Sequence, residues 1–156
     1  LAAGHDYFRL GRLAVSPDGR LLAYATDCDG SERFTLKVRD IASGTDIATI
    51  AANSIGSPVW AADSSALAWT EVDERWRPWR VRLHQIGADG DDAVLFTEPD
   101  VGFRVHVSRS QDRSHWLIVV ADHVTSEVHL VPAAAPLTPP RPVSARAIIL
   151  RNLSGE

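Results

Sequence analysis

The stretch AVSPDGRLLAYATD, residues 14–27, decides the fold because it places a turn sequence between two short apolar segments. Proline restricts the backbone and glycine accepts positive φ, so the Ser-Pro-Asp-Gly sequence of residues 16–19 favours a tight reversal of the chain. Residues 21–26 form a short, mostly apolar run, which is typical of a β-strand. The stretch therefore predicts two antiparallel strands joined by a turn.

The same unit recurs along the chain. The pattern adds strands at residues 34–39 and 47–50, which completes a first set of four. A similar turn around Asp63, 45 positions after Asp18, lies within a second set. This second set begins with the segment 59–64, and its next strands are predicted at residues 66–70, 79–84 and 94–96. A third set is predicted at residues 103–107, 116–120, 127–131 and, among several prolines, near 141–144.

Four strands recurring about every 45 residues are typical of a β-propeller, whose blades cover one another's apolar faces. We therefore expect an all-β fold of about three four-stranded antiparallel blades. The expected boundaries are about 4–50 for blade 1, 57–98 for blade 2 and 101–144 for blade 3, with an unassigned tail at 145–156. An ordinary sandwich or meander is the alternative. Propellers close with roughly four to eight blades, so we expect an incomplete propeller whose open edges self-associate.

Composition and charge limit the classes of partner that we expect for this chain. The net charge of −4 argues against a nucleic-acid or anionic membrane surface, and no apolar run is long enough to span a bilayer. We therefore expect neither nucleic acid nor membrane as a partner. Cys28 is the only cysteine, which excludes an internal disulfide and favours the cytoplasm. The sequence contains no methionine, so we expect its first residue not to be a translation start.

No group of residues predicts catalysis or ligand chemistry. Residues 52–56, Ala-Asn-Ser-Ile-Gly, lack the first glycine of a serine hydrolase elbow. The histidines lack the helical spacing of a zinc protease, and the Asp- and Gly-rich segments 27–32 and 87–92 suit turns better than calcium or phosphate sites. We therefore predict no catalytic residue, no cofactor and no metal site in this chain.

One segment is unusual in its chemistry. Residues 74–82, ERWRPWRVR, interleave four arginines with two tryptophans. Guanidinium groups stack on indole rings and bind carboxylates or phosphates, which would suit a binding role. The candidate interaction surface consists of Arg75, Trp76, Arg77, Trp79 and Arg80. The alternative is the start of a strand, with the tryptophans packed on the blade and the arginines on a polar face.

An ordered set of segments resembles the prolyl oligopeptidase family of serine peptidases. For blade 1 these segments are GHDYFRLG (4–11), VSPDGRLLAY (15–24) and RDIASG (39–44). For blade 2 they are VWAADS (59–64) and RPWRV (77–81), and for blade 3 VSRS (107–110) and DHVTSEV (122–128). Within the family the chain looks most like oligopeptidase B, the branch that cleaves after Arg and Lys.

The resemblance implies a seven-bladed propeller that caps an α/β-hydrolase domain and admits only short peptides. The chain would then be a non-catalytic part of the gating domain. Its partners would be the hydrolase domain of the same protein and short peptide substrates. The family's catalytic motifs do not occur in this sequence, so no catalytic residue is carried over and the chain alone is expected to be inactive. The tail ARAIILRNLSGE (145–156) departs from the family pattern. The alternative function is a free-standing propeller-like scaffold that binds a protein partner.

Overall fold

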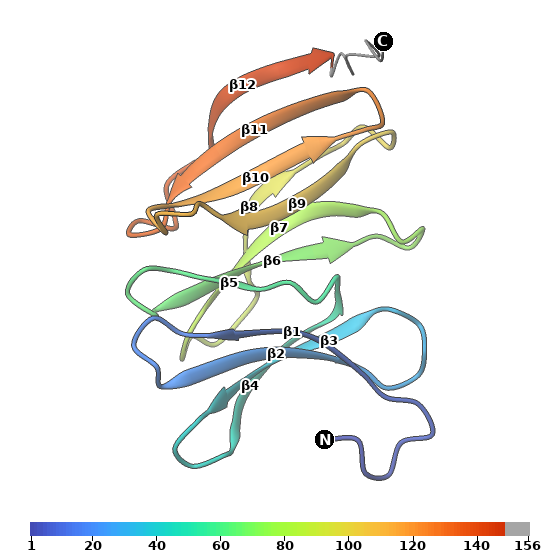
Figure 1. Ribbon diagram of the computed structural model, residues 1–156, viewed down its shortest axis with the longest axis vertical. Helices are drawn as coiled ribbons and strands as arrows, with labels where there is room; N and C mark the ends of the chain where they lie inside the picture. The colour runs from blue at the N-terminus through green and yellow to red at the C-terminus, as the bar shows by residue number, and fades with distance from the viewer. Residues whose placement is uncertain (149–156) are drawn as a thin grey trace, which may run out of the picture.

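The computed structural model describes residues 1–148, which form twelve β-strands and no helix (Figure 1). The strands are β1 (Arg9–Val15), β2 (Leu21–Asp27), β3 (Phe34–Asp40), β4 (Asp46–Ser54), β5 (Val59–Trp60), β6 (Ala66–Val72), β7 (Pro78–Gln85), β8 (Ala93–Thr97), β9 (Arg104–Arg109), β10 (His115–Ala121), β11 (Thr125–Pro132) and β12 (Arg141–Ile148). Every strand pair in the described residues is antiparallel, so the all-β prediction is confirmed. Across these residues no helix has the length and apolar character needed to cross a membrane.

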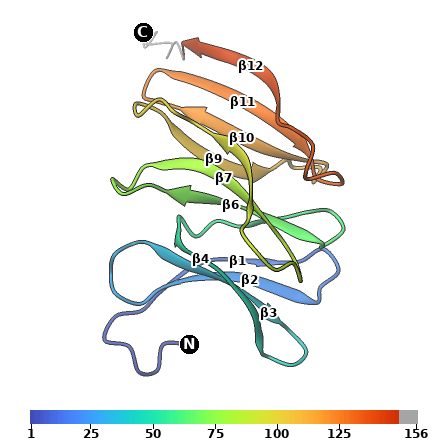
Figure 2. The ribbon, with the colours of Figure 1, turned by 180° about the vertical axis from the view of Figure 1, so that it is seen from behind.

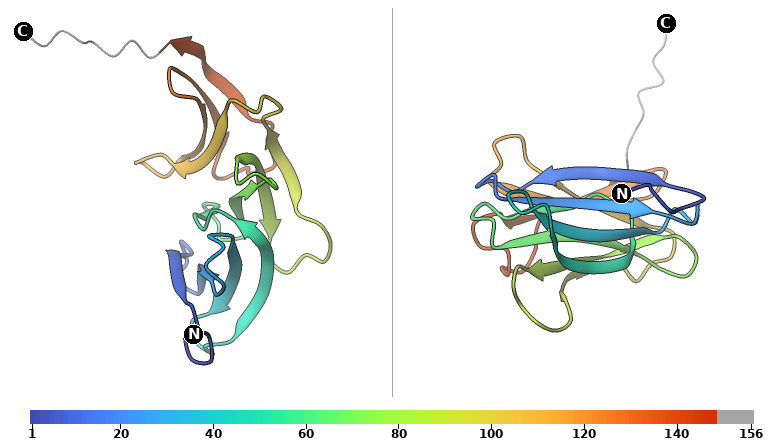
Figure 3. Two further views of the ribbon diagram at one scale, coloured as in Figure 1. Left: turned by 90° about the vertical axis from the view of Figure 1, so that its right-hand side faces the viewer. Right: turned by 90° about the horizontal axis from the view of Figure 1, so that it is seen from below.

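The strands group into three successive units, β1–β4, β5–β8 and β9–β12 (Figures 1 and 2). Figure 3 (left) shows these units fanning out from the side on which their first strands lie. The first strands also follow one another in space, since β1 contacts β5 and β5 contacts β9. A fan of antiparallel blades with the first strand innermost is a partial β-propeller.

Blades 1 and 2 are joined by hydrogen bonds at one corner, which the sequence pattern did not indicate. β5 has only two residues and pairs with Leu67 and Ala68 of β6. The far end of β6 is therefore left without a partner on that edge. The end of β4 fills this gap, because Ser54 pairs with Glu71 and the Ile55 N–H donates to the Thr70 carbonyl at 3.2 Å. The strands of blade 3 form a separate four-stranded sheet.

The last strand of blade 3 is longer than the sequence indicates. The strand expected near residues 141–144 is β12, and it continues to Ile148. The prolines that obscure it, Pro136, Pro139 and Pro140, lie in the loop before the strand. Pro142 lies on β12, the outermost strand of its sheet, where a missing N–H is tolerated. Of the expected tail, residues 149–156 lie outside the described residues.

The turn of the opening stretch occurs in all three blades, between the first and second strands. Each turn contains an aspartate, which is Asp18, Asp63 or Asp112. Its side-chain carboxylate accepts a hydrogen bond of 3.0–3.1 Å from the backbone N–H two residues further on. The residue after the aspartate has positive φ in all three turns: Gly19 at 74°, Ser64 at 65° and Arg113 at 63°. Only the first turn uses glycine, the residue that takes this conformation without strain.

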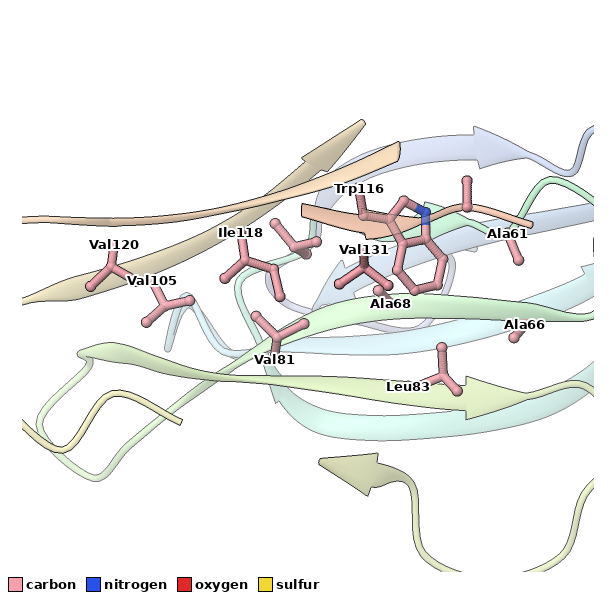
Figure 4. Packing of buried hydrophobic residues seen from close by; sticks show 12 residues of the cluster. Ala61, Ala66, Ala68, Val81, Leu83, Val105, Trp116, Ile118, Val120 and Val131 are labelled. Atoms are coloured by element: carbon pink, nitrogen blue, oxygen red, sulfur yellow. The ribbon is translucent and has the colours of Figure 1, made fainter. Parts of the chain in front are cut away.

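Two apolar clusters hold neighbouring blades together. The first joins blades 1 and 2 and contains Leu21, Ala23, Ala25, Phe34, Leu36, Val38, Trp60, Leu67 and Trp69. The second joins blades 2 and 3 and contains Ala61, Ala66, Ala68, Val81, Leu83, Val105, Val107, Trp116, Ile118, Val120, Val131 and Ala133 (Figure 4). Each blade thus covers the apolar face of its neighbour, as the repeat predicts.

In blades 2 and 3, a tryptophan also donates a hydrogen bond to the preceding blade. The Trp60 indole Nε1–H of β5 donates to the Ala14 carbonyl of β1 at 2.7 Å. The Trp116 indole Nε1–H of β10 donates to the Trp60 carbonyl at 3.1 Å. Both rings are almost completely buried, with exposed fractions of 2% and 0%. These bonds define the spacing between blades, because they link buried groups whose loss is costly.

Candidate functional site

The first strands of the three blades line a groove of about 510 Å³. One wall consists of residues 12–15 of β1, the second of residues 57–60 at β5, and the third of residues 106–109 of β9. The Arg12 N–H donates to the Gly56 carbonyl at 3.1 Å, which holds β1 against the segment that leads into β5. The groove therefore depends on the relative positions of three blades that are far apart in the sequence.

The groove is cationic although the chain is acidic. Its lining residues include Arg12, His106 and Arg109 but no Asp or Glu. On β9, His106 is exposed between the buried Val105 and Val107, as the two-residue period of a strand requires. Desolvation in the groove lowers the pKa of His106, and the nearby Arg12 guanidinium lowers it further. The positive charge at neutral pH is therefore carried by the two arginines.

The arginine- and tryptophan-rich segment does not form one exposed patch. Arg75 and Trp76 are exposed, whereas Arg77, Trp79 and Arg80 are half-buried. The Arg77 Nε donates to Asp73 Oδ2 at 3.0 Å. Its Nη1 donates to three carbonyls of the segment between β8 and β9: Glu98 at 3.1 Å, Asp100 at 2.8 Å and Phe103 at 3.4 Å. Arg77 therefore joins two connecting segments, and a partner for the surface as a whole stays a prediction.

Arginine side chains do stack on tryptophan rings in this region, but one of these arginines comes from outside residues 74–82. The Arg80 guanidinium lies 3.8 Å from the Trp79 ring centroid, and its Nη1 is 3.7 Å from Glu71 Oε2. Arg33, from the connection between β2 and β3, lies 4.7 Å from the Trp76 ring centroid. Sequence reasoning missed Arg33 because it is far from Trp76 along the chain.

The Asp- and Gly-rich segment 27–32 is a turn held by one aspartate. The Asp27 carboxylate accepts N–H donors from Asp29 at 3.1 Å, Gly30 at 2.9 Å and Glu32 at 2.8 Å, so residues 27–32 form a turn as expected. Within residues 1–148, no three His, Cys, Asp or Glu side chains gather in a way that could hold a metal ion. The cationic groove is therefore the candidate binding site of this chain.

The chain is similar in sequence to a known family of protein domains and to known peptidases. The family model described as the prolyl oligopeptidase N-terminal β-propeller domain matches residues 1–155. Dipeptidyl aminopeptidase BI of Pseudoxanthomonas mexicana is 34% identical over 138 residues, which cover 87% of this chain and 19% of that protein. Protease 2 of Moraxella lacunata is 30% identical over 149 residues, which cover 94% of this chain and 22% of that protein.

Solved structures show the same fold. Oligopeptidase B from Leishmania major superposes with a TM-score of 0.84 at 24% identity, and oligopeptidase B from Trypanosoma brucei with a TM-score of 0.81 at 26% identity. Each match covers 94% of this chain and 21% of the other chain. The chain thus spans about a fifth of the length of the relatives it matches. These longer relatives do not favour a free-standing scaffold.

Proposed function

The chain belongs to the prolyl oligopeptidase family, as part of its N-terminal β-propeller domain, and we propose that it serves there as part of a gate for peptide substrates. In this proposal the propeller covers the catalytic domain of a serine peptidase and excludes folded proteins. The protein's substrates are short peptides, cleaved after basic residues. The likeness to two oligopeptidase B structures supports this proposal.

The observation that carries the proposal is the stacking of the blades around their first strands. A size filter needs walls that do not separate under thermal motion. Here the walls are joined by two apolar clusters and by the indole hydrogen bonds of Trp60 and Trp116. Such close-packed interfaces resist small displacements, because every shift opens a void or breaks a buried hydrogen bond.

The chemistry itself is assigned to a partner domain. A peptidase of this class needs a serine nucleophile, a histidine that removes its proton and an aspartate that orients the histidine. We propose that these groups belong to an α/β-hydrolase domain of the same protein. On the ground that Cys28 is the single cysteine of this chain and is free, we also propose a cytoplasmic location.

The gate is tested with substrates of one sequence and two sizes. The protein that carries this chain is given a short arginine-containing peptide, and the same segment within an exposed loop of a folded protein. We expect hydrolysis of the peptide only. Trp116→Phe, which weakens the contact between blades 2 and 3, should raise cleavage of the folded protein relative to the peptide. The control Trp79→Phe should leave this ratio unchanged. Equal cleavage of both substrates by the unmodified protein would refute the gate, and turnover by the purified 156-residue chain alone would refute the assignment of chemistry to another domain.

A further inference from the structure

Some arginines of this chain are paired with an acidic residue and others are not. Carboxylate partners within 4 Å exist for Arg9, Arg39, Arg77, Arg80 and Arg82. Among the side chains that the structure describes, no carboxylate forms such a pair with Arg12 or Arg109. Both of these arginines are exposed and both line the groove between the first strands. The groove therefore presents two guanidinium groups that the fold itself leaves without an acidic partner.

The rest of the groove suits a ligand that is not a small inorganic ion. Leu13 and Val15 line it, each with an exposed fraction of 56%, together with Pro58 and Val59. A volume of about 510 Å³ is far larger than a single anion needs. The lining is mixed, with more polar than apolar surface, and beside two guanidinium groups it fits a peptide with an anionic end.

We propose that this groove binds a carboxylate of a peptide through Arg12 and Arg109. Guanidinium groups hold carboxylates with two parallel N–H···O bonds, and partial exclusion of water strengthens such charge-assisted bonds. The carboxylate is either the C-terminus of the peptide or an Asp or Glu side chain. The choice of a peptide over another anion rests on the proposed function. A site of this kind on the inner wall would hold an acidic end of the substrate away from the catalytic domain.

The proposed site requires three blades, because its two arginines come from blades 1 and 3 and blade 2 lies between them. Arg12 lies on β1 of blade 1 and Arg109 on β9 of blade 3, and β5 of blade 2 contacts both of these strands. The Trp60 hydrogen bond joins β5 to β1, and the Trp116 hydrogen bond joins β10 of blade 3 to β5. The strands that carry the two arginines are therefore held in place by the same contacts that join the blades.

The direct test is calorimetric titration of the full 156-residue chain at neutral pH and low salt. The probes are an N-acetylated alanine pentapeptide with a free C-terminus, the same peptide as its C-terminal amide, and the amide with a central glutamate. We expect the free acid, the glutamate peptide or both to bind about tenfold or more tightly than the plain amide. The two acidic probes distinguish a C-terminal carboxylate from a side-chain carboxylate. Equal affinity for all three peptides, or no binding of either acid, would overturn the proposal.

Variants locate the site. Arg12→Gln and Arg109→Gln should each weaken binding of the acidic peptide about fivefold or more, whereas Arg12→Lys should retain part of the affinity. The matched control is Arg75→Gln, which removes an exposed arginine outside the groove. Circular dichroism of each variant reports whether the chain is folded, and the comparison of acid with amide on the unmodified chain needs no variant. A larger loss with Arg75→Gln than with Arg12→Gln would place binding elsewhere and overturn the proposal.

The test of the carboxylate site can fail without the test of the proposed gate failing, and the reverse is also true. The gate is measured by hydrolysis of large and small substrates, whereas the carboxylate site is measured by binding without turnover. Failure of the acidic peptides to bind would leave the size limit intact. Loss of the size limit with intact binding would contradict the gate alone.

Discussion

Replacing Trp116 with phenylalanine tests how the blades are held together. The indole ring of Trp116 is completely buried in the cluster between blades 2 and 3, and its Nε1–H donates to the Trp60 carbonyl at 3.1 Å. Phenylalanine keeps most of the aromatic contact but removes the donor. Loss of a buried hydrogen bond that leaves one partner unsatisfied costs about 1–3 kcal/mol. The two carbon atoms lost from the ring add about 1.5 kcal/mol. We therefore expect Trp116→Phe to lower the free energy of unfolding by about 3 kcal/mol.

The chain contains a matched control in Trp79. Within the described residues, the Trp79 indole N–H is buried and has no hydrogen-bond partner. Trp79→Phe therefore removes the same atoms without breaking a hydrogen bond, and should cost about 1.5 kcal/mol or less. Both variants are compared by urea unfolding, followed by far-ultraviolet circular dichroism so that the loss of a tryptophan does not change the signal. Equal losses of stability in the two variants would refute the view that the indole hydrogen bond joins the blades.

Three further substitutions have defined outcomes. Arg77→Ala should lower the free energy of unfolding by about 2–4 kcal/mol in urea titrations, because it removes a partly buried ion pair and the guanidinium hydrogen bonds to three backbone carbonyls; a loss as small as that of an exposed arginine would contradict this role. The hydroxyls of Ser110 and Ser114 lower the pKa of Asp112 from 3.8 to about 2, so its contribution to stability is present above pH 4 and is lost as the pH falls toward 2. Asp112→Asn should therefore make the urea midpoint less dependent on pH between 4 and 2, and an unchanged slope would count against this. Arg113→Gly should raise the thermal unfolding midpoint, with a gain of about 0.5–1 kcal/mol in stability, because Arg113 has a φ of 63° that glycine adopts without strain; a lower midpoint would show that the arginine side chain contributes more than the strain costs.

Most of the strand pattern could be predicted from the sequence because it rests on local signals. The turn of residues 16–19 and its counterparts at Asp63 and Asp112 depend on an aspartate that bonds its own backbone, which is visible within a few residues. The two-residue period of strands such as 34–39 is likewise local. β12 was harder to predict, since prolines at 139, 140 and 142 weaken the strand signal, although only Pro142 lies on the strand, at an edge position that tolerates it.

The interaction surface shows the limit of such reasoning. The sequence places Arg75, Trp76, Arg77, Trp79 and Arg80 side by side, yet it does not say which guanidinium is free. Arg77 donates hydrogen bonds to carbonyls more than twenty residues away, and the arginine stacked on Trp76 is Arg33. Neither partner has a signal in the local pattern.

By itself, the sequence determined that the chain is all-β, that its four-strand units repeat and that the turn after the first strand of blade 1 recurs in blade 2, because strand period and turn chemistry are properties of neighbouring residues. The tertiary structure alone decided where charge remains available. Arg12 and Arg109 come from blades 1 and 3 and meet at one groove only because the apolar clusters and the two tryptophan bonds stack the blades in order. Ion pairing likewise depends on distances between residues that are remote in the chain, so the arginines left without an acidic partner emerge only after the blades have packed.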